Sequence, residues 1–157
     1  MGSITTADAL TDVQRDAWAR LTLLMGVVPA QLDEHLRAEA GVNQFQFSVL
    51  EHLAATEGGA ALMSDVARSS DSSLSRLSHT VTRLETLGLV ERRSCDTDRR
   101  ATWAALTDDG HALVVRTQPA YHALVRSLVL DKLDDSQLRQ LSAIVGAVLP
   151  DSGACAS

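Results

Sequence analysis

Residues 72–87 constrain the fold more than any other stretch, because their apolar and polar residues separate at a helical period. At about 100° per residue, the apolar residues form one narrow stripe. The stripe consists of Leu74, Leu77, Val81 and Leu84, with Leu87 at its edge. Gly88 predicts the end of this helix, and the following LVERR predicts a strand. We therefore expect the helix to lie on a packed core with its other side exposed.

The exposed side of this helix carries hydroxyl, imidazole and guanidinium groups, with no acid before Glu85. The residues that we predict to contact DNA from it are Ser72, Ser73, Ser75, Arg76, His79, Thr80 and Arg83. Donors at this spacing can reach base edges in the major groove, and repulsion by phosphates explains the missing acids. The alternative is a solvated surface that lacks acids by chance.

The preceding segment, SDVARSS, predicts a short helix that Ser64 can cap. A brief turn follows, and Asp71 or Ser72 can cap the next helix. A short capped helix, a turn and a longer amphipathic helix together predict a helix-turn-helix. Ser64 is also a candidate phosphate contact, because it lies at the start of the first of these helices.

Two short strands are predicted after the helix, at residues 89–93 and 102–106. The polar loop between them makes a β-hairpin with Asp98, Arg99 and Arg100 near its tip. In a winged helix such a tip reaches the DNA backbone or the adjacent minor groove, where negative potential favours Arg. Asp98 can pair with Arg100 and hold it extended. The alternative is a polar turn whose charges serve solubility.

The charge distribution agrees with a DNA-binding region inside an acidic protein. The whole chain carries a net charge of −6. Residues 64–106 contain seven Arg and six acidic residues, a net charge of +1, so the remainder carries −7. This asymmetry is more informative than the sum, because DNA is contacted by one part of the surface.

The 157 residues fit a single, mainly helical domain with one β-hairpin. We expect long helical segments at 11–41 and 107–149 on either side of a lobe at 45–106. The chain has no apolar run long enough to span a membrane and no signal-like start. The two cysteines, Cys95 and Cys155, are too few for a disulfide framework. We therefore expect the protein to be located in the reducing environment of the cytoplasm.

Residues 62–110 resemble the winged helix-turn-helix of the MarR family of bacterial transcription regulators. Three segments carry the resemblance: MSDVA, SLSRLSHTVTRLETLGLVERR and DRRATWAALTDDG. The last segment fits the family's wing pattern through Asp98, Arg100, Leu106-Thr107 and Gly110. The flanking helices agree in order and length, so the resemblance extends over almost the whole chain.

The resemblance implies a homodimer whose first and last helices interlock, with Arg100 entering the minor groove beside Asp98. The two terminal helical segments independently predict association, because they carry more apolar side chains than a small winged helix can cover. We expect a repressor that binds a palindromic operator in double-stranded DNA.

The sequence leaves several alternatives. No catalytic motif is present, the five histidines are scattered, and we expect no enzyme activity, metal or cofactor. Cys95 lies near four arginines, which leaves redox sensing open, although an ordinary turn residue is the favoured interpretation. The resemblance to the MarR family also implies that the protein could respond to a small-molecule effector. Trp18, His35, Phe45 and Phe47 are the candidate residues for a crevice that would bind it. Core packing is the favoured role of each. A winged helix used only for protein–protein contacts is the remaining alternative.

Overall fold

The computed structural model describes residues 9–94 and 102–149, and all structural statements concern these. Helix α1 (Asp12–Ala40) is followed by α2 (Gln44–Ala55), a 3-10 turn (Glu57–Gly59) and strand β1 (Ala60–Leu62). Helices α3 (Met63–Ser69) and α4 (Leu74–Thr86) come next, then strands β2 (Val90–Ser94) and β3 (Thr102–Leu106). Helix α5 (Asp108–Leu128), a 3-10 turn (Leu130–Lys132) and α6 (Asp135–Val148) complete the chain.

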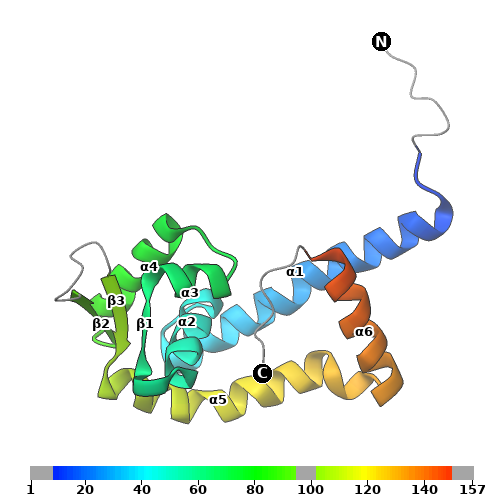
Figure 1. Cartoon of the computed structure of the whole chain (residues 1–157). Helices are drawn as coiled ribbons and strands as arrows, with labels where there is room; N and C mark the ends of the chain where they lie inside the picture. The colour runs from blue at the N-terminus through cyan, green and yellow to red at the C-terminus, as the bar shows by residue number, and fades with distance from the viewer. Residues whose placement is uncertain (1–8, 95–101, 150–157) are drawn as a thin grey trace.

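Figure 1 shows a lobe that contains α2, α3, α4 and the sheet at one end of the molecule. Helices α1 and α5 extend from this lobe in the same direction, and α6 turns back from the far end of α5. The mainly α fold with a small β wing, predicted from the sequence, is confirmed.

The long helices begin at side chains that bond their free backbone N–H groups. Thr11 forms a capping box with Gln14 at the start of α1, and Asp134 forms one with Gln137 at the start of α6. Thr107 caps α5 by accepting a hydrogen bond from the N–H of Gly110. The starts of α1 and α5 agree with the helical segments expected from residues 11 and 107.

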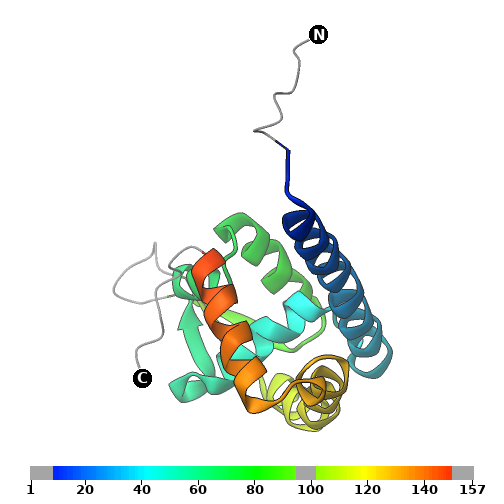
Figure 2. The same ribbon diagram turned by 90° about the vertical axis from the view of Figure 1, so that its right-hand side faces the viewer.

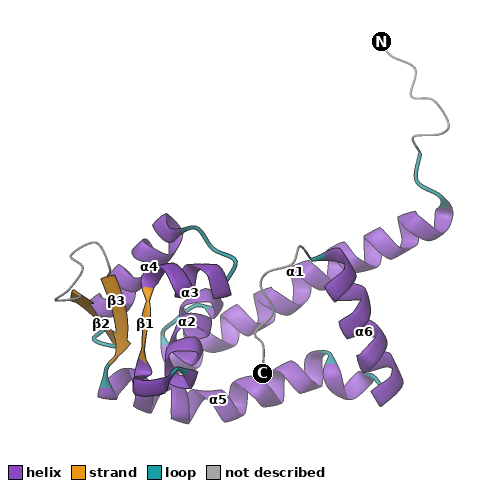
Figure 3. Ribbon diagram, in the orientation of Figure 1, coloured by secondary structure: helices purple, strands orange, loops and turns teal. Residues whose placement is uncertain are grey.

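The sheet differs from the predicted two-stranded hairpin. It has three antiparallel strands in the order β1-β3-β2, so β3 is central (Figure 3). Strand β1 pairs Ala60 with Ala105 and Leu62 with Trp103. With only three residues, β1 is too short to show a period-2 pattern in the sequence, and its partner lies far along the chain.

The core lies inside the lobe and along the adjoining halves of α1 and α5. Its members are apolar side chains from every helix of the lobe and from the sheet. The largest fully buried ones are Phe47, Leu36, Leu50, Leu53, Leu77 and Leu84. Burial of this kind contributes roughly 1.5–3 kcal/mol per large side chain, which makes the lobe a stable platform for α4 and the β-hairpin.

The segment LTDDG, residues 106–110, joins the sheet to α5, and it needs a glycine at position 110. A Cβ at this position would overlap the carbonyl oxygen of Leu89. The neighbouring Thr107 donates its hydroxyl to the Gly88 carbonyl oxygen at 2.7 Å and its N–H to the Leu89 carbonyl oxygen at 3.1 Å. The start of α5 is thereby held against the turn that follows α4.

Candidate nucleic-acid interface

Helix α4 presents the polar surface that its sequence predicts. Leu77, Val81 and Leu84 are fully buried and attach the helix to the core. The predicted reading residues within the helix are exposed, apart from Thr80, which is half-buried. The exposed ones are Ser75, Arg76, His79 and Arg83. The hydroxyl of Thr80 donates to the carbonyl oxygen of Arg76 at 3.0 Å, inside the same helix.

The apolar stripe is shorter than predicted, because Leu74 does not face the core. Its side chain is 55% exposed. Leu74 is the first residue of α4 and follows directly after the cap, so it precedes the turns that pack on the lobe. Leu87, which follows the last helical residue, is also exposed.

The start of α4 also differs from the prediction. Ser73 is the cap: its hydroxyl accepts a hydrogen bond from the N–H of Arg76 at 3.1 Å. Asp71 and Ser72 precede it in the turn, and Asp71 has a φ of 45°, in the left-handed region. Because the turn takes Asp71 and Ser72 out of helical geometry, the cap falls one residue later than the sequence suggested.

Ser64 does not cap α3. The helix begins at Met63, and the residue before it, Leu62, supplies no side-chain cap. Ser64 is therefore the second residue of α3, and its side chain is exposed. The missed strand β1 explains the shift, because the chain passes from Leu62 of the sheet directly into the helix.

Three of the basic side chains around α4 are paired with acids. Arg68 pairs with Asp65 at 3.2 Å on α3, and Arg93 pairs with Glu91 at 2.6 Å on β2. Arg92 pairs with Glu85, the only acid of α4. No acid in residues 9–94 or 102–149 pairs with Arg76 or Arg83. Among the described cations of α3, α4 and β2, only Arg76 and Arg83 of the predicted reading surface are therefore left for a polyanion.

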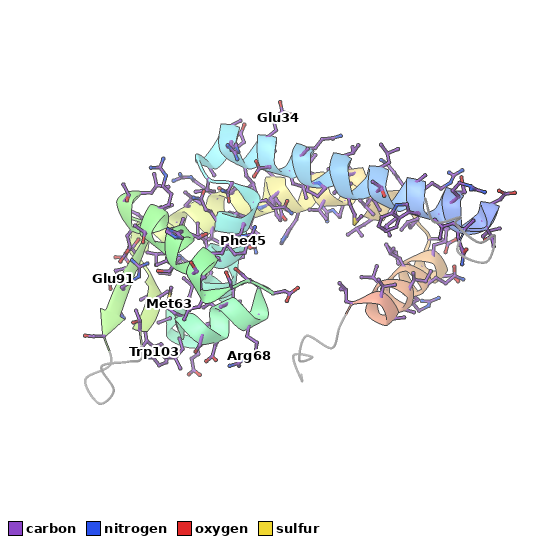
Figure 4. The ribbon with its side chains drawn as sticks, turned by 90° about the horizontal axis from the view of Figure 1, so that it is seen from above. Glu34, Phe45, Met63, Arg68, Glu91 and Trp103 are labelled. Carbon is purple, nitrogen blue, oxygen red and sulfur yellow. The ribbon has the colours of Figure 1, made fainter. Side chains whose placement is uncertain are left out.

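Arg76 lies over an aromatic ring instead of extending straight into solvent. The carbon at the centre of its guanidinium is 4.3 Å from the centroid of the Phe45 ring, a cation–π distance. Phe45 belongs to the first turn of α2, close to α1 (Figure 4). The sequence did not indicate this pair, because the two residues lie on different helices with no spacing that links them.

An open hollow of about 390 Å³ lies between α1, the start of α2 and Arg76. Phe45 is the only one of the four predicted crevice residues that lines it. Phe47 is fully buried and packs edge-on against Tyr121 at 5.1 Å between ring centroids, and burial raises the pKa of Tyr121. Trp18 is exposed on the N-terminal half of α1, and His35 is half-buried with an unbonded Nε2.

The tip of the predicted wing, with Cys95, Asp98, Arg99 and Arg100, lies outside the described residues. The strands that lead to it are β2 and β3, paired from Val90 with Leu106 to Ser94 with Thr102. Figure 4 shows Glu91 and Trp103 on these strands at the same end of the molecule as α4.

Among the described residues, no three His, Cys, Asp or Glu side chains are arranged to hold a metal ion. Within the same residues, no helix is long and apolar enough to cross a lipid bilayer.

Comparison with known proteins gives this surface a context. The family model described as MarR family matches residues 40–101, which include α2, α3, α4 and β2. The crystal structure of Sco3205 from Streptomyces coelicolor, a MarR family transcriptional regulator in complex with DNA, is 32% identical. It superimposes with a TM-score of 0.87, over 89% of this chain and 88% of that one. The chain belongs to the MarR family.

AbsC, another MarR family regulator from Streptomyces coelicolor, is 32% identical, with a TM-score of 0.86 over 89% of this chain and 94% of its own. The transcriptional repressor MprA of Escherichia coli is 29% identical over 104 residues, 65% of this chain. That match spans 59% of MprA's length. MarR proteins are transcription regulators and not enzymes, which agrees with the absence of a catalytic motif.

Two residues near the predicted reading surface were not identified from the sequence. Glu85 and Arg92 connect α4 to β2 through several hydrogen bonds. The available signal was that Glu85 is the only acid in an otherwise acid-free helix, followed seven residues later by Arg92 on the next strand.

Proposed function

We propose that this MarR protein is a homodimeric transcriptional repressor that binds a palindromic DNA operator. The observation that carries the proposal is the exposed surface of α4. Its cations Arg76 and Arg83 pair with no described acid, and its only acid, Glu85, is paired with Arg92. Such a surface attracts phosphates and offers donors to base edges.

In this proposal α4 lies in the major groove. Ser75, Arg76, His79 and Arg83 face the bases, and Arg76 leaves the Phe45 ring to reach a guanine. Ser72, Ser73 and Thr80 lie at the margin of this surface and contact the DNA backbone. The similarity to Sco3205, whose structure contains DNA, supports this docking.

Contacts to the sugar–phosphate backbone are proposed at both ends of the α4 surface. Ser64, exposed at the start of α3, bonds a phosphate. Arg100, oriented by Asp98 and assisted by Arg99, enters the minor groove. The proposal for the wing rests on the sequence, and that for Ser64 also on its exposure.

The homodimer is supported by apolar side chains that the single chain leaves exposed. On α1 they are Val13, Trp18, Leu21, Leu23, Leu24, Met25 and Val27. On the last helix they are Ile144, Val145 and Val148, and α6 has no buried residue. Patches this extensive mark interfaces, and a second copy that interlocks the same helices covers both. A two-fold dimer places two reading helices about 34 Å apart, which matches a palindrome.

The repressor role is supported by the likeness to MprA, which is named a transcriptional repressor. A protein that occupies an operator over a promoter blocks transcription without further chemistry. The proposed site of action is the cytoplasm, where the DNA lies.

The proposal is tested by selecting genomic fragments that bind the purified full-length protein. We expect a palindromic consensus, a bound stoichiometry of two chains per site, and repression of a reporter that carries the selected site. Binding that shows no sequence preference at low ionic strength would contradict the proposal.

Arg76→Ala tests the reading role directly. It should cost about 1–3 kcal/mol on the operator and relax base preference at one position per half-site. The matched control is Arg116→Ala, which removes an exposed cation from α5 outside the reading surface. Arg100→Ala should instead weaken all sequences and flatten the dependence of affinity on salt.

A further inference from the structure

Helix α4 and strand β2 are joined by more than the turn between them. Strand β2 lies at the edge of the sheet, where backbone groups are unpaired on one side. The N–H of Arg92 points to this open side and donates to the Glu85 carboxylate at 3.0 Å. The Arg92 guanidinium also pairs with the second oxygen of Glu85. One carboxylate thus bonds both the backbone and the side chain of the strand.

The same guanidinium also bonds residues nearer the start of α4. One of its terminal nitrogens donates to the Ser78 carbonyl oxygen at 2.7 Å and to the Thr82 hydroxyl at 3.0 Å. The Thr82 hydroxyl itself donates to the Ser78 carbonyl oxygen at 2.9 Å. The bonds made by Arg92 thus extend from Glu85 back to Ser78, about two turns of helix.

An isolated surface ion pair stabilises a protein very little. This arrangement differs, because the Arg92 and Glu85 side chains are only 28% and 29% exposed and each makes several bonds. A planar guanidinium that bonds several acceptors at once holds their relative positions in a way that a point charge does not. The Arg92 guanidinium therefore connects β2 to α4 at several points along the helix.

Both proposed DNA-contacting elements have residues close in sequence to this bonded group. Arg83 follows Thr82 directly, and the predicted wing follows Ser94, two residues after Arg92. We infer that Glu85 and Arg92 are positioning residues that hold the recognition helix and the wing strand in one fixed arrangement, so that base reading and wing contact occur together. This inference rests on the proposed DNA binding. It assigns neither residue a contact with DNA.

The two possible roles of Arg92 predict different outcomes for specificity. A cation that only attracts phosphates contributes equally to every sequence. A positioning residue contributes most where the helix must be placed accurately on particular bases. The ratio of operator affinity to affinity for a scrambled duplex separates these roles, because the first role leaves the ratio unchanged.

The chain offers a matched control pair on the same strand. Arg93 pairs with Glu91 within β2, through an Arg93 Nε to Glu91 Oε1 bond of 2.7 Å, and both side chains are more than half exposed. Arg92→Met and Arg93→Met remove the same charge from neighbouring positions. Glu85→Gln and Glu91→Gln likewise remove one negative charge each.

Arg92→Met should lower the specificity ratio by about ten-fold, comparable to one mismatched base pair. Arg93→Met should change both affinities by a similar factor and keep the ratio within about two-fold, as expected for a phosphate-directed charge. Glu85→Gln is the sharpest variant, because loss of an acid near DNA strengthens binding by electrostatics alone. We expect it to weaken operator binding, while Glu91→Gln does not.

The inference is overturned if Arg92→Met and Arg93→Met act alike, or if Glu85→Gln tightens operator binding. Should wild-type protein bind no DNA, the proposed function itself fails, which is a distinguishable result. Circular dichroism and thermal unfolding of each variant identify any loss of fold.

Amide hydrogen exchange on the wild-type protein supplies a measurement that needs no variant. The N–H groups of Glu91 and Arg93 point toward β3, since neighbours alternate along a strand. Protection of the Arg92 N–H comparable to theirs is expected from its bond to Glu85. Exchange of the Arg92 N–H at the rate of an unprotected amide would overturn the inference.

Discussion

The lobe that contains α4 and the helical arms of this MarR protein differ in how far their apolar side chains are buried. The lobe, from α2 to β3, packs with the adjoining parts of α1 and α5 around a continuous apolar core, and several of its surface charges are paired. The arms are the N-terminal half of α1 together with α6, and they expose apolar side chains. Figure 2 shows α6 standing apart from α1. The same chain therefore contains one region whose apolar side chains are buried within the chain and one whose apolar side chains are left exposed.

The difference teaches which part of the molecule depends on a partner. Helix α6 has 14 residues and none of them is buried. Helices of this length are marginal in water without tertiary packing. The lobe needs no second copy to bury its core, whereas the arms reach comparable burial only in the proposed dimer.

The two regions meet where α1 passes the start of α2. Leu32 and Leu36 are buried there, in contrast to the exposed apolar residues earlier in the same helix. Asp33 accepts a hydrogen bond from the backbone N–H of Gln44 at 2.9 Å and one from Arg37 at 2.7 Å. The joint between arm and lobe is thus fixed by both packing and polar bonds.

The largest effect is expected from a charge placed in an arm. Ile144 is 63% exposed in the single chain, so Ile144→Asp costs little there. In the proposed dimer it buries an unpaired carboxylate at a cost of several kcal/mol, which lowers operator affinity by about a hundred-fold or more. Sedimentation should show monomers.

The control for this variant is His111→Asp, which places a new acid in the first turns of α5, beside the lobe. It should leave the dimer intact. If Ile144→Asp sediments as a dimer, a second copy of the chain does not cover the exposed apolar side chains of α6 as proposed.

A methyl group inserted where α5 packs against the lobe should cost about 3 kcal/mol of unfolding free energy, since tightly packed sites resist overpacking. Gly110→Ala is the variant, because its Cβ overlaps the Leu89 carbonyl oxygen. Chemical denaturation measures the loss, with Ala112→Ser, an exposed change on the same helix, as the control. A Gly110→Ala protein of wild-type stability would show that the lobe is less closely packed than described.

A smaller loss, about 1 kcal/mol, is expected when α4 loses its cap. Ser73→Ala removes the hydroxyl that accepts the Arg76 N–H. Ser72→Ala is its matched control, one residue earlier, and should have little effect on stability. Thermal unfolding compares the stability of the two variants. A larger loss for Ser72→Ala than for Ser73→Ala would show that Ser72 is the cap.

The smallest effect concerns pH at the joint. The Gln44 backbone N–H, followed by Arg37, lowers the pKa of Asp33 below its ordinary value. A carboxyl with a lowered folded pKa stabilises the fold above its unfolded pKa of about 3.9, and this contribution disappears as pH falls through the folded pKa. Asp33→Asn should therefore flatten the loss of stability in that acidic range. If the denaturation midpoint of Asp33→Asn fell from neutral to acidic pH as steeply as that of the wild type, Asp33 would not stabilise the joint between arm and lobe.

The parts of this fold that depend on local chemistry were predictable from the sequence. Thr11, Thr107 and Asp134 are caps because a side chain bonds an N–H three residues later, within one turn. The buried stripe of α4 follows from its helical period. The polar surface opposite that stripe was therefore also predictable, and with it the candidate site.

The errors arose where contacts link distant segments. Strand β1 exists because Ala60–Leu62 pair with β3, and that strand moved the start of α3 ahead of Ser64. Leu74 carries the correct period, but no part of the described chain covers it. A period shows which side of a helix is apolar, and only the packing partners decide how far along the helix that side is buried.

The sequence by itself determined the order of the helices, their principal caps and the separation of apolar from basic groups, because these follow from interactions within a few residues. The tertiary structure decided that Glu85 bonds Arg92, that Arg76 lies over Phe45, and that α6 is left uncovered. Those outcomes depend on the distance between side chains of different elements, and residue types and spacing alone do not contain that distance.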